Sequence, residues 1–234
     1  MRITKKKIFV AALAVCLIAI LSFGTLAWFT AEDTVTNKFM VTTSDSNGTP
    51  DFSVEIFEHK VDSETGKKVS NEEVEGNIYK NILPGSKVDK DPTVRNTGLY
   101  DQWIRVKVTL SNYDVWCDAL ANGGLYDFSG ILKTIGSEWL HDPATDRAFN
   151  ADVTTATFTY YLKDPLLAAK NNGGIADTAT LFTSVEIPTA FTEDNMKFTG
   201  TQNGVFDISI VAEAVQKENI ADTCKAAFAV IDAQ

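Results

Sequence analysis

Histidine and cysteine are scarce in this chain, which contains two histidines and three cysteines among 234 residues. A zinc peptidase of the common helical type needs two histidines one turn apart, with a glutamate as general base. His59 and His141 are far apart in sequence, and the nucleophile motif Gly-x-Ser-x-Gly and a glycine-rich phosphate loop are missing. The sequence therefore indicates a protein that is not an enzyme, with no catalytic residues, no metal site and no cofactor.

Positive charge is also scarce. The chain has 21 Lys and Arg against 31 Asp and Glu, for a formal net charge of -10 at pH 7. Clustered Lys and Arg are what bind a phosphate backbone, so the composition predicts no nucleic-acid partner. A hydrophobic content of 44% is enough for a core, and no repeat or linker divides the chain after its start.

The start of the chain combines basic residues with an uncharged apolar run that ends before Glu32. Thr25 and Ala27 are small residues that fit the two subsites of a signal peptidase, which predicts cleavage between Ala27 and Trp28. We expect residues 1–27 to be a signal peptide, with an uncleaved membrane anchor as the alternative. Both interpretations place the remaining chain outside the cytoplasm. The predicted location is secreted, in an extracellular matrix or at the cell surface, with a signal peptidase as partner during export and membrane contact only through the precursor's signal segment.

The remaining cysteines leave two alternatives. Cys16 lies inside the apolar run, so a mature chain contains only Cys117 and Cys224. In an oxidising exterior these two residues form one disulfide, or both are buried thiols. The sequence does not decide between the two.

Most of the chain after the signal alternates between apolar and polar residues with a period of two. The segments with this pattern are 52–56, 102–111, 157–163, 181–187 and 206–213. Apolar spacings of three and four predict helices over 113–120 and 219–231. Half-buried strands of this kind are typical of antiparallel sheets. The pattern therefore predicts one mainly β domain over 44–234, an antiparallel β-sandwich with a few short inserted helices.

Several polar residues have expected structural roles. Asn96 stands two positions before Gly98, a spacing typical of an Asx turn. Arg105 falls on the polar face of the strand predicted over 102–111, so we expect a solvated side chain that pairs with an acid on a neighbouring strand. His59 and His141 are expected at the surface.

Three regions in order along the chain carry a family resemblance. They are residues 24–30 (GTLAWFT), 83–86 (LPGS) followed by 94–98 (VRNTG) and 103–106 (WIRV), and 212–216 (AEAVQ). Together they resemble the TasA/CalY (camelysin-like) family, whose members have a SipW-type signal peptide. The resemblance implies a jelly-roll subunit that is exported through a dedicated signal peptidase on Gram-positive cells. It also implies assembly into extracellular fibres of the biofilm matrix, with further copies of the chain or related matrix subunits as partners.

The resemblance further implies that the mature N-terminal segment, residues 28–43, is donated as a strand to the next subunit. Its alternating residues are compatible with a strand, and those on one side are Val35, Asn37, Phe39 and Val41. Head-to-tail donation fills an open sheet edge and propagates as a filament. The alternative is an ordinary first strand within the same subunit. Two other functions stay open, a membrane-anchored or secreted surface binding module and a secreted metalloendopeptidase, which the resemblance to some family members suggests.

Overall fold

The structure, a computed structural model, describes residues 52–80, 82–119, 130–191 and 207–233. The chain divides into two units, Met1–Glu32 and Asp33–Gln234, and every described residue belongs to the second unit. The predicted signal peptide and the segment 28–43 lie outside the described residues. Within the described ranges, no helix has both the length and the apolar character needed to span a membrane.

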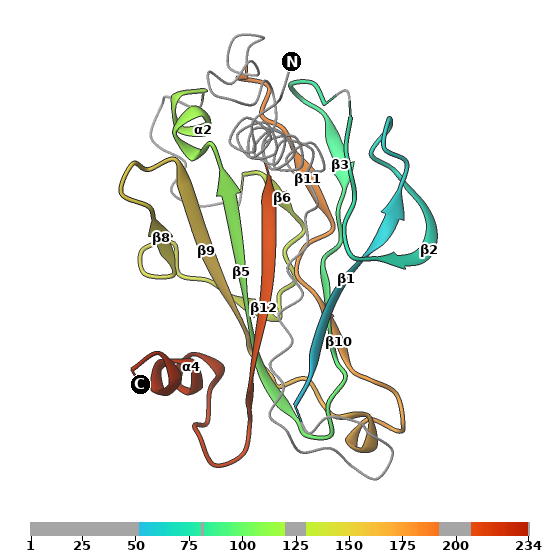
Figure 1. Cartoon of the computed structure of the whole chain (residues 1–234), viewed down its shortest axis with the longest axis vertical. Coiled ribbons are helices and arrows are strands. Elements are labelled where there is room, and N and C mark those ends of the chain that lie inside the picture. Colours follow the sequence, from blue (N-terminus) through green and yellow to red (C-terminus); the bar gives the residue numbers. More distant parts are fainter. Residues whose placement is uncertain (1–51, 81, 120–129, 192–206, 234) are drawn as a thin grey trace, which may run out of the picture. The chain divides into compact units, whose positions relative to one another are not determined.

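The described strands form three antiparallel sheets (Figure 1). The first sheet has the order β10-β4-β1-β2, the second β3-β11-β6 and the third β12-β5-β9-β7, with β8 also paired to β9. The strand bounds are β1 (Val54–Val61), β2 (Lys68–Val74), β3 (Lys87–Asp89), β4 (Thr93–Asn96), β5 (Gln102–Ser111), β6 (Leu132–Lys133), β7 (Trp139–Leu140), β8 (Arg147–Phe149), β9 (Thr155–Leu162), β10 (Thr178–Thr180), β11 (Ser184–Glu186) and β12 (Ile208–Gln216). The helices within the described residues are α2 (Tyr113–Ala119), α4 (Cys224–Asp232) and the short 3₁₀ helix η1 (Ala169–Asn171).

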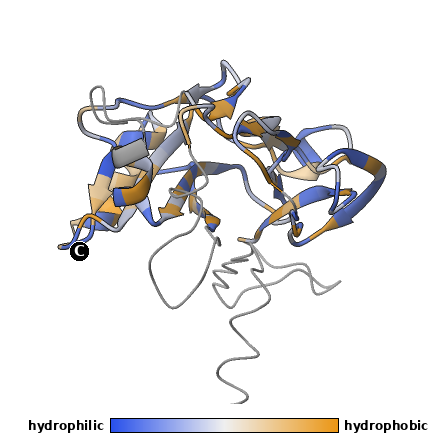
Figure 2. Ribbon diagram, turned by 90° about the horizontal axis from the view of Figure 1, so that it is seen from above, coloured by the Kyte–Doolittle hydropathy of each residue, from blue (hydrophilic) through white to orange (hydrophobic). Residues whose placement is uncertain are grey.

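One hydrophobic core joins residues from all three sheets. Strand β9 shows how the period-two pattern builds this core, because its buried residues alternate with half-buried ones. The buried set is Ala156, Phe158, Tyr160 and Leu162. Figure 2 shows the same alternation of hydrophobic and hydrophilic residues along the ribbons of the sheets. The predicted mainly β fold, a jelly-roll-like antiparallel sandwich with a few short helices, is confirmed.

The predicted strands agree with the structure to different degrees. The strand predicted over 102–111 has the same bounds as β5. Of the segment 181–187, only Ser184–Glu186 forms a strand, β11. Leu181 lies before it, and its backbone N–H donates to the carbonyl of Pro92 (2.9 Å). Some of the apolar residues at 181–187 therefore lie in a loop and not in a strand. A period-two pattern does not distinguish the two.

The last helix begins later than the sequence pattern predicts. Asn219 has a φ of 64°, which is outside the helical region. Helix α4 begins at Cys224, and the side chain of Thr223 caps it by accepting a hydrogen bond from the backbone N–H of Ala226. The predicted start at residue 219 is therefore wrong, because α4 begins five residues later, where a cap residue and not the apolar spacing sets the helix start.

Helix α4 packs on the five-stranded sheet and changes the expected environment of Arg105. Trp103 of β5 lies in a second buried cluster with Cys224, Ala227 and Phe228 of α4. The side chain of Arg105, on the same strand, is only 8% exposed. Its expected pairing with an acid on the neighbouring strand is confirmed, because it forms an ion pair with Glu213, its register partner on β12. The expectation of a solvated side chain is wrong, since α4 covers this face.

Candidate functional site

Strand β12 forms one edge of the five-stranded sheet. It pairs with β5 along its whole length, from Ile208 opposite Leu110 to Gln216 opposite Gln102. On its other side no described strand pairs with it, although β1 runs close to it (Figure 1). An edge strand of nine residues offers a row of backbone donors and acceptors to a further strand.

The ladder shows which residues of β12 offer these groups. Ser111 donates its backbone N–H to the carbonyl of Asp207 (3.0 Å), and Lys217 donates to the carbonyl of Asp101 (3.1 Å). In an antiparallel ladder every second residue bonds to the same neighbour. The odd-numbered residues of β12 therefore bond to β5, and the even-numbered residues direct their N–H and C=O groups to the outer edge. The even-numbered residues are Ile208, Ile210, Ala212, Ala214 and Gln216.

The β12 edge differs from the edge at β2. Six of the seven residues of β2 are exposed, and the strand includes Lys68, Glu72 and Glu73. Charged side chains on an edge strand oppose pairing with another chain. Strand β12 has a single charged residue, Glu213, which is held by Arg105 and Lys107 of β5. Of these two edges, that of β12 is therefore the better acceptor for an added strand.

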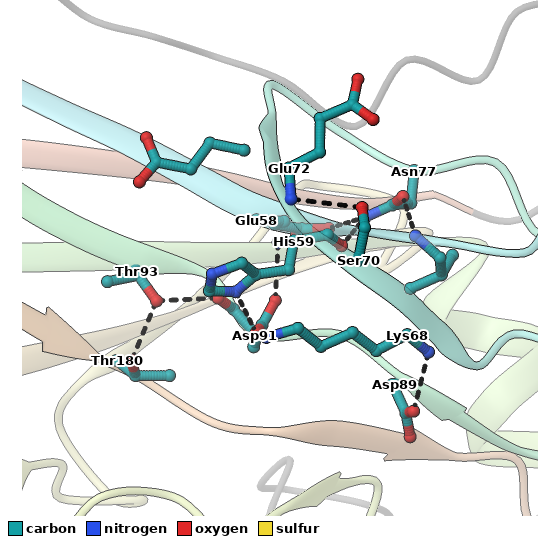
Figure 3. A network of polar contacts seen from close by, with 12 residues as sticks. Glu58, His59, Lys68, Ser70, Glu72, Asn77, Asp89, Asp91, Thr93 and Thr180 are labelled. Carbon is teal, nitrogen blue, oxygen red and sulfur yellow. Dashed lines mark hydrogen bonds and ion pairs between the residues drawn. The ribbon is translucent and has the colours of Figure 1, made fainter.

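A buried polar cluster lies beside β1, which belongs to the four-stranded sheet. Glu58 Oε1 of β1 and the side-chain nitrogen of Lys90, the residue after β3, lie 2.7 Å apart, and the two side chains are only 5% and 3% exposed. The second carboxyl oxygen of Glu58 accepts a hydrogen bond from the side-chain nitrogen of Asn77 (3.1 Å), which follows β2 (Figure 3). One carboxyl group thus contacts an amine through Oε1 and an amide through Oε2.

An irregularity in β1 holds the amide of Asn77 in place. The register of β1 against β2 shifts between His59 and Val61. At this point the backbone N–H of Val61 donates to Asn77 Oδ1 (2.9 Å). The carbonyl of His59 accepts a second hydrogen bond from Asn77 Nδ2 (3.0 Å). Because an extra residue in a strand frees backbone groups from the ladder, the irregularity supplies both contacts.

His59 and Asp91 lie next to this cluster. The ring nitrogen Nδ1 of His59 is 2.6 Å from Asp91 Oδ2, and the backbone N–H of His59 donates to Asp91 Oδ1 (2.9 Å). Thr93 donates its hydroxyl to the carbonyl of Asp91 and contacts the hydroxyl of Thr180, both at 2.9 Å (Figure 3). His59 is therefore half-buried in a polar network. The surface position that the sequence suggested for this residue is wrong.

Burial decides the protonation of the Glu58–Lys90 pair. Burial raises the pKa of Glu58 from 4.5 to about 8, an effect that the hydrogen bond from Asn77 reduces and the charge of Asp91 increases. Burial also lowers the pKa of Lys90 from 10.5 to about 7, although Asp91 opposes this change. Desolvation penalises both charged forms. It therefore favours a neutral carboxylic acid beside a neutral amine, with a single proton shared within the pair.

Cys117 and Cys224 are not joined by a disulfide in the structure. Cys117 is half-buried and packs against the main core, whereas Cys224 lies in the separate cluster under α4. The thiol of Cys224 donates to the carbonyl of Ile104 (3.0 Å), and burial raises its pKa to about 12. Of the two alternatives for this pair, the structure therefore has thiols, and the disulfide is not formed because the residues belong to different clusters.

The remaining predicted residues have varied outcomes. The expected Asx turn is confirmed, because the backbone N–H of Gly98 donates to Asn96 Oδ1 (2.9 Å). His141 is half-buried and stacks on Tyr160 with 4.6 Å between the ring centres, so its expected surface position is wrong.

Other predicted sites lie beyond what the structure describes. The cleavage residues Ala27 and Trp28 and the donor residues Val35, Asn37, Phe39 and Val41 are outside the described residues. In the described part of the chain, no three His, Cys, Asp or Glu residues lie close enough to hold a metal ion. Comparisons with protein-family models, curated proteins and solved structures find no match for the chain. The resemblance to the TasA/CalY family therefore stays a prediction.

Glu58, Asn77 and Lys90 were not among the site residues predicted from the sequence. One signal for Glu58 was present, because it continues the alternation of Val54 and Ile56 and therefore falls on the apolar face of its strand. A charged residue at such a position needs a buried partner. Asn77 and Lys90 lie outside the strands, where no periodicity indicates which face they occupy.

Proposed function

We propose that the chain is an exported structural subunit that assembles head-to-tail into extracellular fibres. Each copy donates residues 28–43 to the outer edge of β12 in the next copy. The alternating pattern of residues 28–43 and the resemblance to exported matrix subunits support this proposal. The observation that carries it is the long, weakly charged edge of β12, for which the described residues contain no second partner strand.

The donated strand and the edge have compatible chemistry. Residues 35–41 are shorter than the nine-residue β12, so they fit along it without overhang. Backbone groups of the incoming strand would bond to the even-numbered residues of β12, and its alternate side chains would extend the apolar face that Ile208 and Ile210 form. The donor segment, residues 28–43, and the acceptor edge, β12, are different segments of one chain. Such a contact is head-to-tail, and a filament results when the rotation between subunits does not close a ring.

The first experiment removes the donor. Protein beginning at Trp28 and protein beginning at residue 44 are purified and incubated at equal concentration, and filaments are counted by negative-stain electron microscopy. We expect filaments from the first protein and none from the second. A synthetic peptide of residues 28–43 should bind to the shortened protein. Filaments of normal yield from the shortened protein would refute strand donation, and a wild-type protein that remains monomeric would favour a surface binding module.

The second experiment blocks the acceptor. Ala214→Pro removes an N–H that points to the outer edge of β12, while the hydrogen bonds to β5 come from the odd-numbered residues. Proline is tolerated in an edge strand at a position of this kind. Ala214→Val, which keeps the N–H, is the matched control. We expect Ala214→Pro to fold without assembling and Ala214→Val to assemble, whereas filaments from a folded Ala214→Pro protein would exclude β12 as the acceptor.

A further inference from the structure

The buried cluster beside β1 brings three reactive groups together. Lys90 supplies an amine, Asn77 supplies a carboxamide, and Glu58 contacts both at 2.7 Å and 3.1 Å through its two carboxyl oxygens. The geometry points to an intramolecular isopeptide bond between Lys90 Nζ and Asn77 Cγ, with Glu58 as the catalytic residue that transfers the protons. This inference does not depend on the proposed assembly into fibres.

The amine of Lys90 is prepared for nucleophilic attack. An ammonium group has no lone pair to donate, so attack requires the neutral amine. Lys90 is almost completely excluded from solvent, and burial lowers its pKa to about 7. Amine in the reactive form is therefore present near neutral pH. The charge of Asp91 acts on both members of this pair, and Tyr79 interacts with Glu58. His59 contacts Asp91, and the hydroxyl of Tyr79 donates to the carbonyl of Asp89.

The amide of Asn77 is prepared as the electrophile. The backbone N–H of Val61 donates to Asn77 Oδ1 at 2.9 Å, the oxygen on which negative charge develops when the amine adds to the carbonyl carbon. A fixed donor at this position stabilises the tetrahedral intermediate in the manner of an oxyanion hole. The carbonyl of His59 holds the nitrogen of the same amide at 3.0 Å, which fixes the plane of the group.

Glu58 completes the proton transfers. Burial favours its neutral carboxylic acid. As Lys90 Nζ adds to Asn77 Cγ, Nζ passes one proton to Glu58 Oε1, and Glu58 Oε2 gives one proton to Asn77 Nδ2. The bond between Cγ and Nδ2 then breaks and ammonia leaves. The products are a secondary amide between the two side chains, one ammonia molecule and Glu58 protonated as before, so no oxidant or other reactant is needed.

A surface pair in the same region shows the ordinary alternative. Lys60 and Glu72 form an ion pair of 2.9 Å, but their side chains are 49% and 57% exposed. The Glu58–Lys90 pair differs in two ways. Its side chains are buried, and the second oxygen of the carboxyl group accepts a hydrogen bond from the side-chain amide of Asn77.

The test is the mass of the purified, folded protein. We expect the intact mass to be lower than the sequence mass by one ammonia molecule. Trypsin cleaves after Lys68, Lys80 and Lys87, but it does not cleave after a lysine whose Nζ is acylated. The digest should therefore contain peptide 69–80 joined to peptide 88–95. A folded wild-type protein with the full sequence mass would overturn the inference, and this measurement needs no variant.

Variants separate the bond from other losses of ammonia. Asn77 also loses ammonia if it cyclises to a succinimide with its own backbone, a reaction that needs no lysine. Lys90→Arg should therefore restore the full mass, and Lys60→Arg, at the exposed pair, should leave the ammonia loss unchanged. A loss that persists in Lys90→Arg would refute the isopeptide bond. Glu58→Gln should also show the full mass, and a fully linked Glu58→Gln protein would refute the catalytic role of Glu58.

Discussion

Replacing Arg105 tests how α4 is held on the five-stranded sheet. The guanidinium group forms ion pairs with Glu213 of β12 and with Asp232 at the end of α4. Its central carbon also lies 4.3 Å from the ring centre of Phe228. Arg105→Met replaces the aliphatic part of the arginine side chain with an apolar chain and removes the charge. We expect the variant to fold with a weaker attachment of α4.

The structure gives the size of the effect. A hydrogen bond to a charged group contributes about 1.5–3 kcal/mol, and the partly buried pair with Glu213 belongs in this range. The pair with Asp232 contributes at most about 1 kcal/mol, because that side chain is half-exposed and solvent screens it. Glu213 keeps a second cation in Lys107 at 2.8 Å, so the variant does not leave it without a partner. The free energy of unfolding should therefore fall by about 3 kcal/mol for Arg105→Met and by about 1 kcal/mol for Asp232→Asn.

Urea unfolding at two pH values is the assay. The Arg105 guanidinium hydrogen-bonded to Asp232 lowers the pKa of that carboxyl below its usual 3.8. Ionised Asp232 therefore stabilises the fold above pH 3.8, and this contribution is lost as the pH falls through the lowered value. The difference between wild type and Asp232→Asn should be present at neutral pH and vanish in acid well below 3.8. A difference that persists in acid, or an Arg105→Met protein as stable as wild type, would refute the reasoning.

Gly66, Cys224 and Phe228 allow further tests of how closely the buried parts of the fold are packed. Gly66 has a φ of 63°, and a Cβ at this position would overlap Val88. Gly66→Ala should therefore lower the free energy of unfolding by about 2 kcal/mol or more. Gly173 has a φ of 66° but open space around it, so Gly173→Ala should lower the free energy of unfolding by about 1 kcal/mol. Equal losses in urea unfolding would contradict the overlap. Because burial raises the pKa of Cys224 to about 12, iodoacetamide should modify this residue only after unfolding. Mass spectrometry that finds Cys224, and not only the half-buried Cys117, labelled in the native protein would contradict this. Phe228 is 3% exposed, so Phe228→Ala should lower the unfolding free energy by about 3–5 kcal/mol, and a loss under 1 kcal/mol would show that α4 is not fixed by this ring.

The parts of the fold that were predictable from sequence are those that local patterns determine. Strand β5 has the bounds predicted from alternation, and the Asx turn at Asn96 follows from a side chain that bonds two residues ahead. The environment of Arg105 was not predictable in this way. It depends on Asp232 and Phe228, which lie more than a hundred residues away in sequence, and no local pattern shows that α4 returns to cover that face.

The buried cluster of Glu58, Asn77 and Lys90 was also only partly predictable from local sequence patterns. Glu58 carried a local signal, a charged residue on the apolar face of a strand. Asn77 and Lys90 became neighbours of this residue through the irregularity in β1 and through the pairing of β3 with β11. Both features arise from contacts between strands. The sequence therefore indicated that Glu58 needs a partner, but it did not indicate which residues supply one.

The acceptor edge and the isopeptide cluster share no residue, so each can be changed while the other is kept. The acceptor edge consists of β12, whereas the isopeptide cluster consists of Glu58, Asn77 and Lys90, with no residue in common. Ala214→Pro should therefore keep the loss of ammonia while it blocks filaments. Lys90→Arg should restore the full mass while the protein still assembles, because an edge strand binds through backbone groups that the cluster does not touch. If Lys90→Arg folds but forms no filaments, the cluster and the edge are coupled, and the assignment of assembly to β12 alone is wrong.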